Sequence, residues 1–223
     1  MSDIPLTGVL TAEFSSDFSA LANQLAEHGY AVVPSFLQQG VGESLVDEIA
    51  RLWDDGEYRR AAVGRGHERK VRSEIRSDHV HWLDPIDLTP PQRGYWEQME
   101  RMREALNRDL FLGLFDFEAH LACFQPGAHY QAHLDQHRET RARVVSAVVY
   151  LNERWAPEDG GHLRLYIDRN LGTAGPWIDI IPEFGKLVIF LSADFWHEVL
   201  PARRERHSLT GWFRRRIDEV PLT

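Results

Sequence analysis

The sequence predicts an α+β fold in which a double-stranded β-helix (jelly roll) core of about eight strands is buttressed by N-terminal helices. Apolar residues recur at helical spacing through much of residues 1–115. From residue 116 onward, short apolar runs alternate with breaks that contain glycine or proline, a pattern typical of antiparallel strands. No repeat or low-complexity segment interrupts this order. We therefore expect a single domain over 1–223, with helical support in 1–115 and the jelly-roll core in 116–216.

The N-terminal half contains start and stop signals for helices. Asp17 can cap a first helix, and Gly29 can end it. Thr89, followed by two prolines, is a typical start for a later helix. The expected elements are helices over about 17–28, 41–55 and 90–110, and a strand over 30–33.

The C-terminal half predicts the strands of the jelly roll. Turn signals such as Pro126-Gly127 separate short runs that are rich in β-branched and aromatic residues. The expected strands are 118–124, 129–136, 143–151, 162–167, 177–181, 186–191, 195–200 and 207–215.

Residues 57–80 differ from both halves. They are rich in arginine and histidine and show little apolar periodicity. We expect a long exposed loop or loose hairpin here, because long loops in compact domains are commonly mobile lids.

Composition and charge exclude several classes. The net charge of −9 disfavours a general nucleic-acid binder. The single cysteine, Cys123, rules out an internal disulfide and fits a reducing cytoplasm. Residues 1–14 lack the features of a signal peptide, and the longest apolar run, 187–191, is too short to span a membrane. We expect a cytoplasmic protein without a membrane partner and, since no coiled-coil pattern is visible, a monomer.

A candidate metal site is formed by His133 and Asp135, read together with His197. Residues two apart on a β-strand project from the same face, so one strand can offer an imidazole and a carboxylate to one ion. Two histidines and one carboxylate leave coordination positions open, as in non-haem Fe(II) oxygenases. His-x-Asp alone is common by chance, so this interpretation depends on the surrounding residues.

A candidate anion site lies in the same part of the chain. Arginines crowd the C-terminal region, and Arg206 follows His197 by nine residues. An arginine fork suits a bidentate carboxylate, and the hydroxyl of Tyr150 could share it.

The order and spacing of these motifs resemble the 2-oxoglutarate- and Fe(II)-dependent oxygenases of the prolyl 4-hydroxylase type, in particular bacterial relatives of the oxygen-sensing prolyl hydroxylases. The resemblance spans most of 60–216. The matching residues are Ile75-Arg76-Ser77-Asp78 through Trp82, Pro126-Gly127, Tyr130-x-x-His133-x-Asp135, Tyr150-Leu151-Asn152-x-x-Trp155, Gly160-Gly161-x-Leu163-Arg164-Leu165, His197-Glu198-Val199-x-Pro201, Arg206 and Thr210-x-Trp212.

The resemblance implies a role for each matching residue. His133, Asp135 and His197 would bind Fe(II), and Arg206 with Tyr150 would bind the far carboxylate of 2-oxoglutarate. O2 would be the co-substrate, and the family admits ascorbate as a further cofactor. Pocket and wall positions next to the co-substrate would be Thr210, Trp212, Leu163 and Val148. Substrate would meet Arg76, Asp78 and Tyr130.

One position departs from the family pattern. The family often carries a tyrosine just before the Pro-Gly, near the co-substrate, whereas this chain has Gln125 there, preceded by Phe124. Glutamine can still donate a hydrogen bond, so we keep Gln125 as a co-substrate contact.

The resemblance implies hydroxylation of a prolyl residue in a protein or peptide, with release of succinate and CO2, and elongation factor Tu is the first candidate substrate. Two alternatives remain at this point. The same chemistry could act on a free amino acid or other small molecule, or the site could be a cupin-like zinc hydrolase or regulatory metal-binding module. A hydrolase has no need of a carboxylate clamp, so Arg206 and Tyr150 discriminate between the classes.

Overall fold

The computed structural model describes residues 18–62, 71–72, 74–136 and 140–216. The helices are α1 (Ser19–His28), α2 (Gln39–Asp54) and α3 (Pro90–Leu110), with short 3-10 turns at Pro157–Asp159 and Gly172–Ala174. One group of strands comprises β1 (Tyr30–Val33), β2 (Arg59–Arg60), β3 (His79–Trp82), β4 (Asp116–Phe124), β6 (Arg143–Tyr150), β9 (Leu187–Leu191) and β11 (Arg206–Arg214). The other comprises β5 (Tyr130–His133), β7 (Leu163–Tyr166), β8 (Trp177–Ile180) and β10 (His197–Val199).

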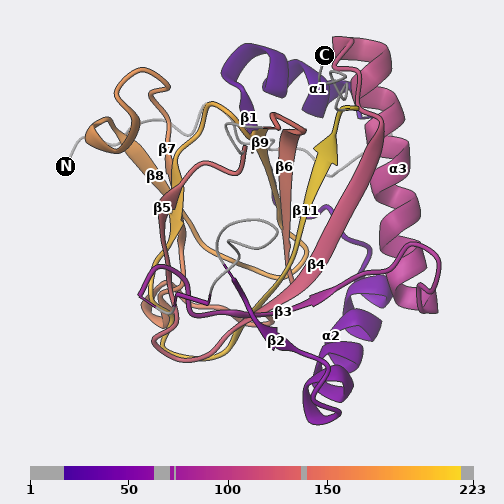
Figure 1. The fold of residues 1–223 in the computed structure, drawn as a ribbon, viewed down its shortest axis with the longest axis vertical. Coiled ribbons are helices and arrows are strands. Elements are labelled where there is room, and N and C mark those ends of the chain that lie inside the picture. The colour runs from indigo at the N-terminus through magenta and orange to yellow at the C-terminus, as the bar shows by residue number, and fades with distance from the viewer. Residues whose placement is uncertain (1–17, 63–70, 73, 137–139, 217–223) are drawn as a thin grey trace, which may run out of the picture.

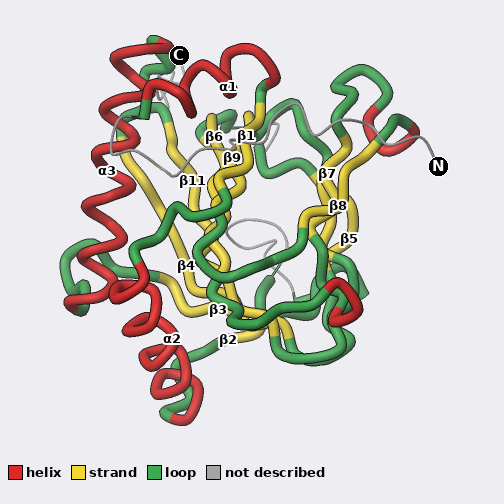
Figure 2. The backbone as a smooth tube through the Cα atoms, turned by 180° about the vertical axis from the view of Figure 1, so that it is seen from behind, coloured by secondary structure: helices red, strands yellow, loops and turns green. Residues whose placement is uncertain are grey.

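The strands form two antiparallel sheets. The larger sheet has the order β1-β9-β6-β11-β4-β3-β2, and the smaller has the order β5-β10-β7-β8. Strands β4 to β11 are the eight expected core strands, four in each sheet, so the predicted jelly-roll core is confirmed. The helices gather on the side of the larger sheet, and β5, β7 and β8 lie on the opposite side of the molecule (Figure 1). The view from behind shows the same separation (Figure 2).

The central strands of the larger sheet are buried on both faces. Along β11, Leu209 and Phe213 belong to the core under the helices, whereas Ser208, Thr210 and Trp212 line a cavity on the other face. A second apolar cluster between the sheets includes Val188 and Phe190 of β9 together with Leu163 and Leu165 of β7. Because both faces of these central strands are covered, their sequences are almost continuously apolar, and the few polar residues in them are conspicuous.

Helix α3 begins where its capping residues predict. The side chain of Thr89 accepts a hydrogen bond from the backbone N–H of Gln92, and the Gln92 side chain accepts one from the backbone N–H of Thr89. Both side chains also donate to the buried carboxylate of Glu48 on α2, with a distance of 2.6 Å from Thr89 Oγ1. The cap of α3 therefore also joins α3 to α2.

We expect Thr89→Ala to lower the free energy of unfolding by about 2–3 kcal/mol, because it removes a helix cap and a hydrogen bond to a buried carboxylate together. Urea denaturation measures the change. Ser44→Ala is the control, since its exposed hydroxyl bonds only within α2. A loss below about 0.5 kcal/mol for Thr89→Ala would contradict the prediction.

Of the two expectations for 57–80, a long loop or a loose hairpin, the structure shows the hairpin. Arg59–Arg60 and His79–Trp82 pair as β2 and β3, and β3 adds to the edge of the larger sheet beside β4. Residues 63–70 and 73 of this segment lie outside the described residues, as do Asp17 and residues 137–139. None of the described helices is both long enough and apolar enough to cross a membrane.

Candidate active site

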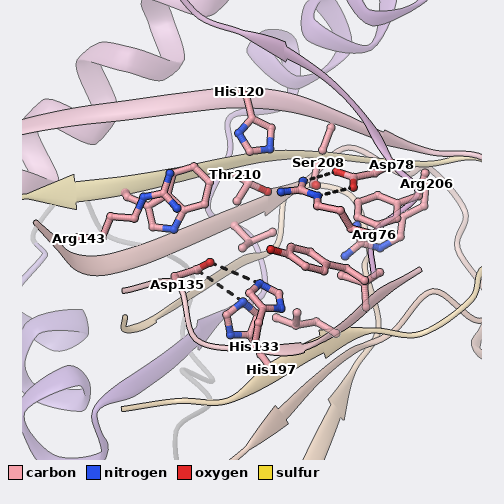
Figure 3. Close-up of a pocket in the computed structure, with 17 residues that line it drawn as sticks. Arg76, Asp78, His120, His133, Asp135, Arg143, His197, Arg206, Ser208 and Thr210 are labelled. Carbon is pink, nitrogen blue, oxygen red and sulfur yellow. Dashed lines mark hydrogen bonds and ion pairs between the residues drawn. The ribbon is translucent and has the colours of Figure 1, made fainter. Parts of the chain in front are cut away.

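The three predicted metal ligands meet at one point (Figure 3). His133 ends β5, His197 begins β10, and the two lie opposite each other in the antiparallel pairing. Asp135 lies two residues past the end of β5 rather than within the strand, and it reaches both histidines from there. Its Oδ1 lies 3.5 Å from His133 Nε2, and its Oδ2 lies 3.5 Å from His197 Nε2. One ligand atom of each residue lies within 4.8 Å of the others.

Backbone carbonyls orient both imidazoles. His133 Nδ1 lies 2.7 Å from the carbonyl oxygen of Gln131, and His197 Nδ1 lies 3.1 Å from that of Phe195. Because a carbonyl only accepts, Nδ1 must carry a proton, so Nε2 is the nitrogen that each ring can offer to a metal. Burial and the neighbouring His133 lower the pKa of His197 to about 4, so His197 is neutral at physiological pH. Imidazoles that present Nε2 to a shared carboxylate in this way are suited to bind a metal.

A buried serine pair fixes the carboxylate. Ser146 of β6 donates a hydrogen bond to Asp135 Oδ2 at 2.7 Å, and its hydroxyl lies 2.8 Å from that of Ser192. Both serines are completely buried. The sequence interpretation missed Ser146, although a lone polar residue within an apolar strand signals such a role.

One cavity extends from the triad between the sheets, and it leaves about 540 Å³ free of protein atoms, open mouth included. The wall opposite the triad carries His120, Ser208 and Thr210 (Figure 3). The full lining is Arg76, Asp78, His120, Ala122, Phe124, Tyr130, His133, Asp135, Arg143, Val148, Leu163, His197, Val199, Arg206, Ser208, Thr210 and Trp212.

The cavity also contains a buried cation without a matching anion. Arg206 is 1% exposed, and within the described part of the chain no carboxylate lies at ion-pair distance from it. Its Nε donates to the carbonyl of Gly161 at 2.8 Å. Gly161 has φ +64°, and a Cβ there would lie 3.0 Å from Arg206 Cδ, so a side chain at this position would crowd the arginine. An unpaired buried charge is costly, which indicates an anion-binding site.

Tyr150 supports the same anion site. Its ring centroid lies 5.0 Å from the guanidinium carbon of Arg206, and its buried hydroxyl has no hydrogen-bond partner among the described residues. Burial raises the pKa of Tyr150 to about 12, so the hydroxyl is protonated and can donate. The guanidinium and this hydroxyl are the donors that a carboxylate would need.

The donor set therefore fits Fe(II) with 2-oxoglutarate. Two imidazoles and a carboxylate form the expected triad, and the same cavity holds a guanidinium that has no carboxylate partner among the described residues and could bind a distal carboxylate.

The structure brings most of the other predicted site residues to this cavity. The predicted wall and pocket residues line it: Thr210, Trp212, Leu163 and Val148. The predicted substrate contacts line it as well: Arg76, Asp78 and Tyr130.

Gln125 stays a prediction as a co-substrate contact. It is not among the cavity-lining residues, and its side-chain amide lies 3.3 Å from the sulfur of Cys123. Phe124 lines the cavity instead, with its ring 5.0 Å from the guanidinium carbon of Arg206. The physical reason is strand alternation, since β4 ends at Phe124 with that side chain facing the cavity.

His120 and Arg143 are further cavity residues that the sequence interpretation missed. His120 is 3% exposed, and its Nδ1 has no hydrogen-bond partner among the described residues. Burial, with Arg76 and Arg143 nearby, lowers the pKa of His120 well below its usual range, so its ring is neutral. Arg143 lies over the Trp212 ring at 3.5 Å and donates to Glu118.

Comparison with known proteins agrees with this site. Residues 119–214 match the family model described as 2OG-Fe(II) oxygenase superfamily. The chain is 43% identical to a prolyl-4-hydroxylase from Pseudomonas putida, with a TM-score of 0.79, over 89% of this chain and 99% of that one. It is 30% identical over 203 residues to the hypoxia-inducible factor prolyl hydroxylase of Caenorhabditis elegans, and 29% identical over 197 residues to Egl nine homolog 1 of Homo sapiens.

These matches cover 85% and 84% of this chain, but the chain spans only 27% and 44% of those two curated relatives. The fold and the site define a 2-oxoglutarate- and Fe(II)-dependent oxygenase. Within that class, the chain belongs to the prolyl hydroxylase family.

Proposed function

We propose that this chain hydroxylates a prolyl residue of a protein or peptide, consuming 2-oxoglutarate and O2 and releasing succinate and CO2. The observation that supports it most is the buried Arg206, which has no carboxylate partner in the described part of the chain. It lies in the same cavity as the His133, Asp135 and His197 triad. The prolyl hydroxylases of Pseudomonas putida and Caenorhabditis elegans to which it is similar support the choice of substrate class. Its single cysteine supports a cytoplasmic location.

Different residues of the cavity would bind the metal and the co-substrate. His133, Asp135 and His197 would hold the iron, with Ser146 keeping one oxygen of Asp135 in place. Arg206 and Tyr150 would bind the distal carboxylate of 2-oxoglutarate. When bound, iron and 2-oxoglutarate supply the activation of dioxygen that places a hydroxyl group on a substrate carbon.

Apolar and mouth residues complete the site. Val148 and Leu163 would exclude water from the co-substrate. Arg76 and Asp78 form a two-bond ion pair, with distances of 2.8 and 2.5 Å, that would shape the substrate entrance. A peptide is favoured over a small molecule, because the Caenorhabditis elegans protein to which the chain is similar is a hypoxia-inducible factor prolyl hydroxylase.

The test is turnover with a proline-containing peptide in the presence of Fe(II), 2-oxoglutarate and air. We expect the peptide to gain one oxygen atom by mass spectrometry, together with one succinate per turnover. The control peptide carries alanine in place of the proline and should remain unmodified. Succinate formation that depends on free proline but not on peptides would favour the small-molecule alternative, and no hydroxylation of any prolyl peptide would refute the proposal.

As a finer proposal, elongation factor Tu is the first protein substrate to assay, since the sequence resembles bacterial relatives of the oxygen-sensing enzymes. Intact elongation factor Tu and its proline-containing peptides should then be hydroxylated more efficiently than unrelated prolyl peptides. Equal efficiency on unrelated peptides would remove it as the preferred substrate.

A further inference from the structure

A short segment that follows β2 runs along the strand that carries a metal ligand. The backbone N–H of Gln131 donates to the carbonyl of Ile75 at 2.9 Å, and that of Ser77 donates to the carbonyl of His129 at 3.1 Å. Arg76 and Tyr130 form the β-bridge between these bonds. Since β5 is an edge strand of the smaller sheet, residues 74–77 act as its extra neighbour.

Side chains extend this contact into a stack. The Tyr130 ring lies on the His133 imidazole, with the centroids 3.6 Å apart and the planes at 19°. The guanidinium carbon of Arg76 lies 4.4 Å from the centroid of the Tyr130 ring. Arg76 is held in turn by Asp78, whose side chain is completely buried. An unbroken series of contacts therefore leads from Asp78 to the metal ligand His133.

His133 is the ligand that most needs such support. Its side chain is 18% exposed, compared with 5% for His197. His197 also packs against Phe190, with ring centroids 4.7 Å apart. The carbonyl of Gln131 fixes which nitrogen of His133 faces the metal, but this hydrogen bond by itself does not stop the ring from rotating about it. Stacking on Tyr130 restrains that rotation.

We propose that Tyr130 is a positioning residue of the metal centre, which couples the placement of residues 74–78 to the orientation of His133. The proposal rests on the proposed function in one respect, namely that the triad binds a metal. A peptide that displaces Arg76 at the cavity mouth would then alter the metal site through two ring contacts, without touching a metal ligand. Groups that orient a metal ligand are worth about 10- to 100-fold in metal affinity.

The test uses Co(II) as a probe of the metal-free protein, because its visible spectrum reports coordination geometry and its affinity can be measured by calorimetry. We expect Tyr130→Leu to weaken Co(II) binding about 10- to 100-fold and to change the spectrum. Tyr130→Phe keeps the ring and should keep both affinity and spectrum. Arg76→Gln should act in the direction of Tyr130→Leu with an effect of about 2- to 5-fold, as expected for loss of one cation–π contact.

Tyr58→Leu is the matched control, since it removes a buried tyrosine that packs on Trp53 away from the cavity. It should leave Co(II) binding unchanged. Wild-type affinity and spectrum in Tyr130→Leu would overturn the proposal. If circular dichroism shows that Tyr130→Leu does not fold, Arg76→Gln becomes the test, and an unchanged Co(II) spectrum of Arg76→Gln would overturn the proposal.

A wild-type protein that binds Co(II) but hydroxylates no prolyl peptide would refute the proposed function and leave this proposal standing.

Discussion

Arg206→Ala is expected to weaken 2-oxoglutarate binding about 100-fold while the metal still binds. Arg206 is the buried cation of the cavity and has no carboxylate partner among the described residues, so its charge is free for a ligand. Losing charge-assisted hydrogen bonds to a carboxylate costs about 3 kcal/mol, which corresponds to about 100-fold in affinity. Anaerobic titration with 2-oxoglutarate, followed by the visible charge-transfer band of the Fe(II) complex, measures the change.

Arg203→Ala is the matched control, since Arg203 is an exposed arginine near the same strand. It should bind 2-oxoglutarate like the wild type. If Arg206→Ala binds 2-oxoglutarate with wild-type affinity, the distal carboxylate of 2-oxoglutarate does not bind at Arg206. Metal-dependent hydrolysis that survives in Arg206→Ala, without any need for 2-oxoglutarate, would instead support the zinc-hydrolase alternative.

His197→Ala is expected to abolish the charge-transfer band by weakening metal binding more than about 100-fold. Groups that only hydrogen-bond to a metal ligand are worth up to about 100-fold, so loss of a ligand itself should exceed this. His197 is also the more deeply buried of the two imidazoles, and no other histidine belongs to the cluster within the described residues. Calorimetric titration of the metal-free protein with Fe(II) under anaerobic conditions measures the affinity.

His162→Ala is the control for this experiment, because His162 is half-buried and does not line the cavity. Its metal affinity should match the wild type. Retained Fe(II) affinity in a folded His197→Ala protein would mean that the metal does not bind at the triad. Tight binding of zinc with no band in the wild type would count against 2-oxoglutarate as the co-substrate.

The local sequence pattern was sufficient to predict the strands of the jelly-roll core. All eight expected core strands occur within a few residues of their expected bounds, because turn residues and alternating side chains are local signals. A loose hairpin was expected over 57–80, but the position of β3 was not predicted, since its mixture of histidines with Val80 and Trp82 becomes a strand only by pairing with β4. Sequence comparison alone also did not show that Phe124, next to Gln125, lines the cavity. The alternation of side chains along β4 turns Phe124 toward it.

The sequence by itself therefore determined the class of fold, the identity of the triad and the presence of an arginine near it. The tertiary structure decided which residues act together. It placed Ser146 on Asp135 and stacked Tyr130 between Arg76 and His133, and it left Arg206 without a carboxylate partner among the residues that it describes. These relations join strands far apart in the chain, and their energies depend on burial and distance. The spacing of residues along one strand does not determine burial or the distance between side chains of different strands.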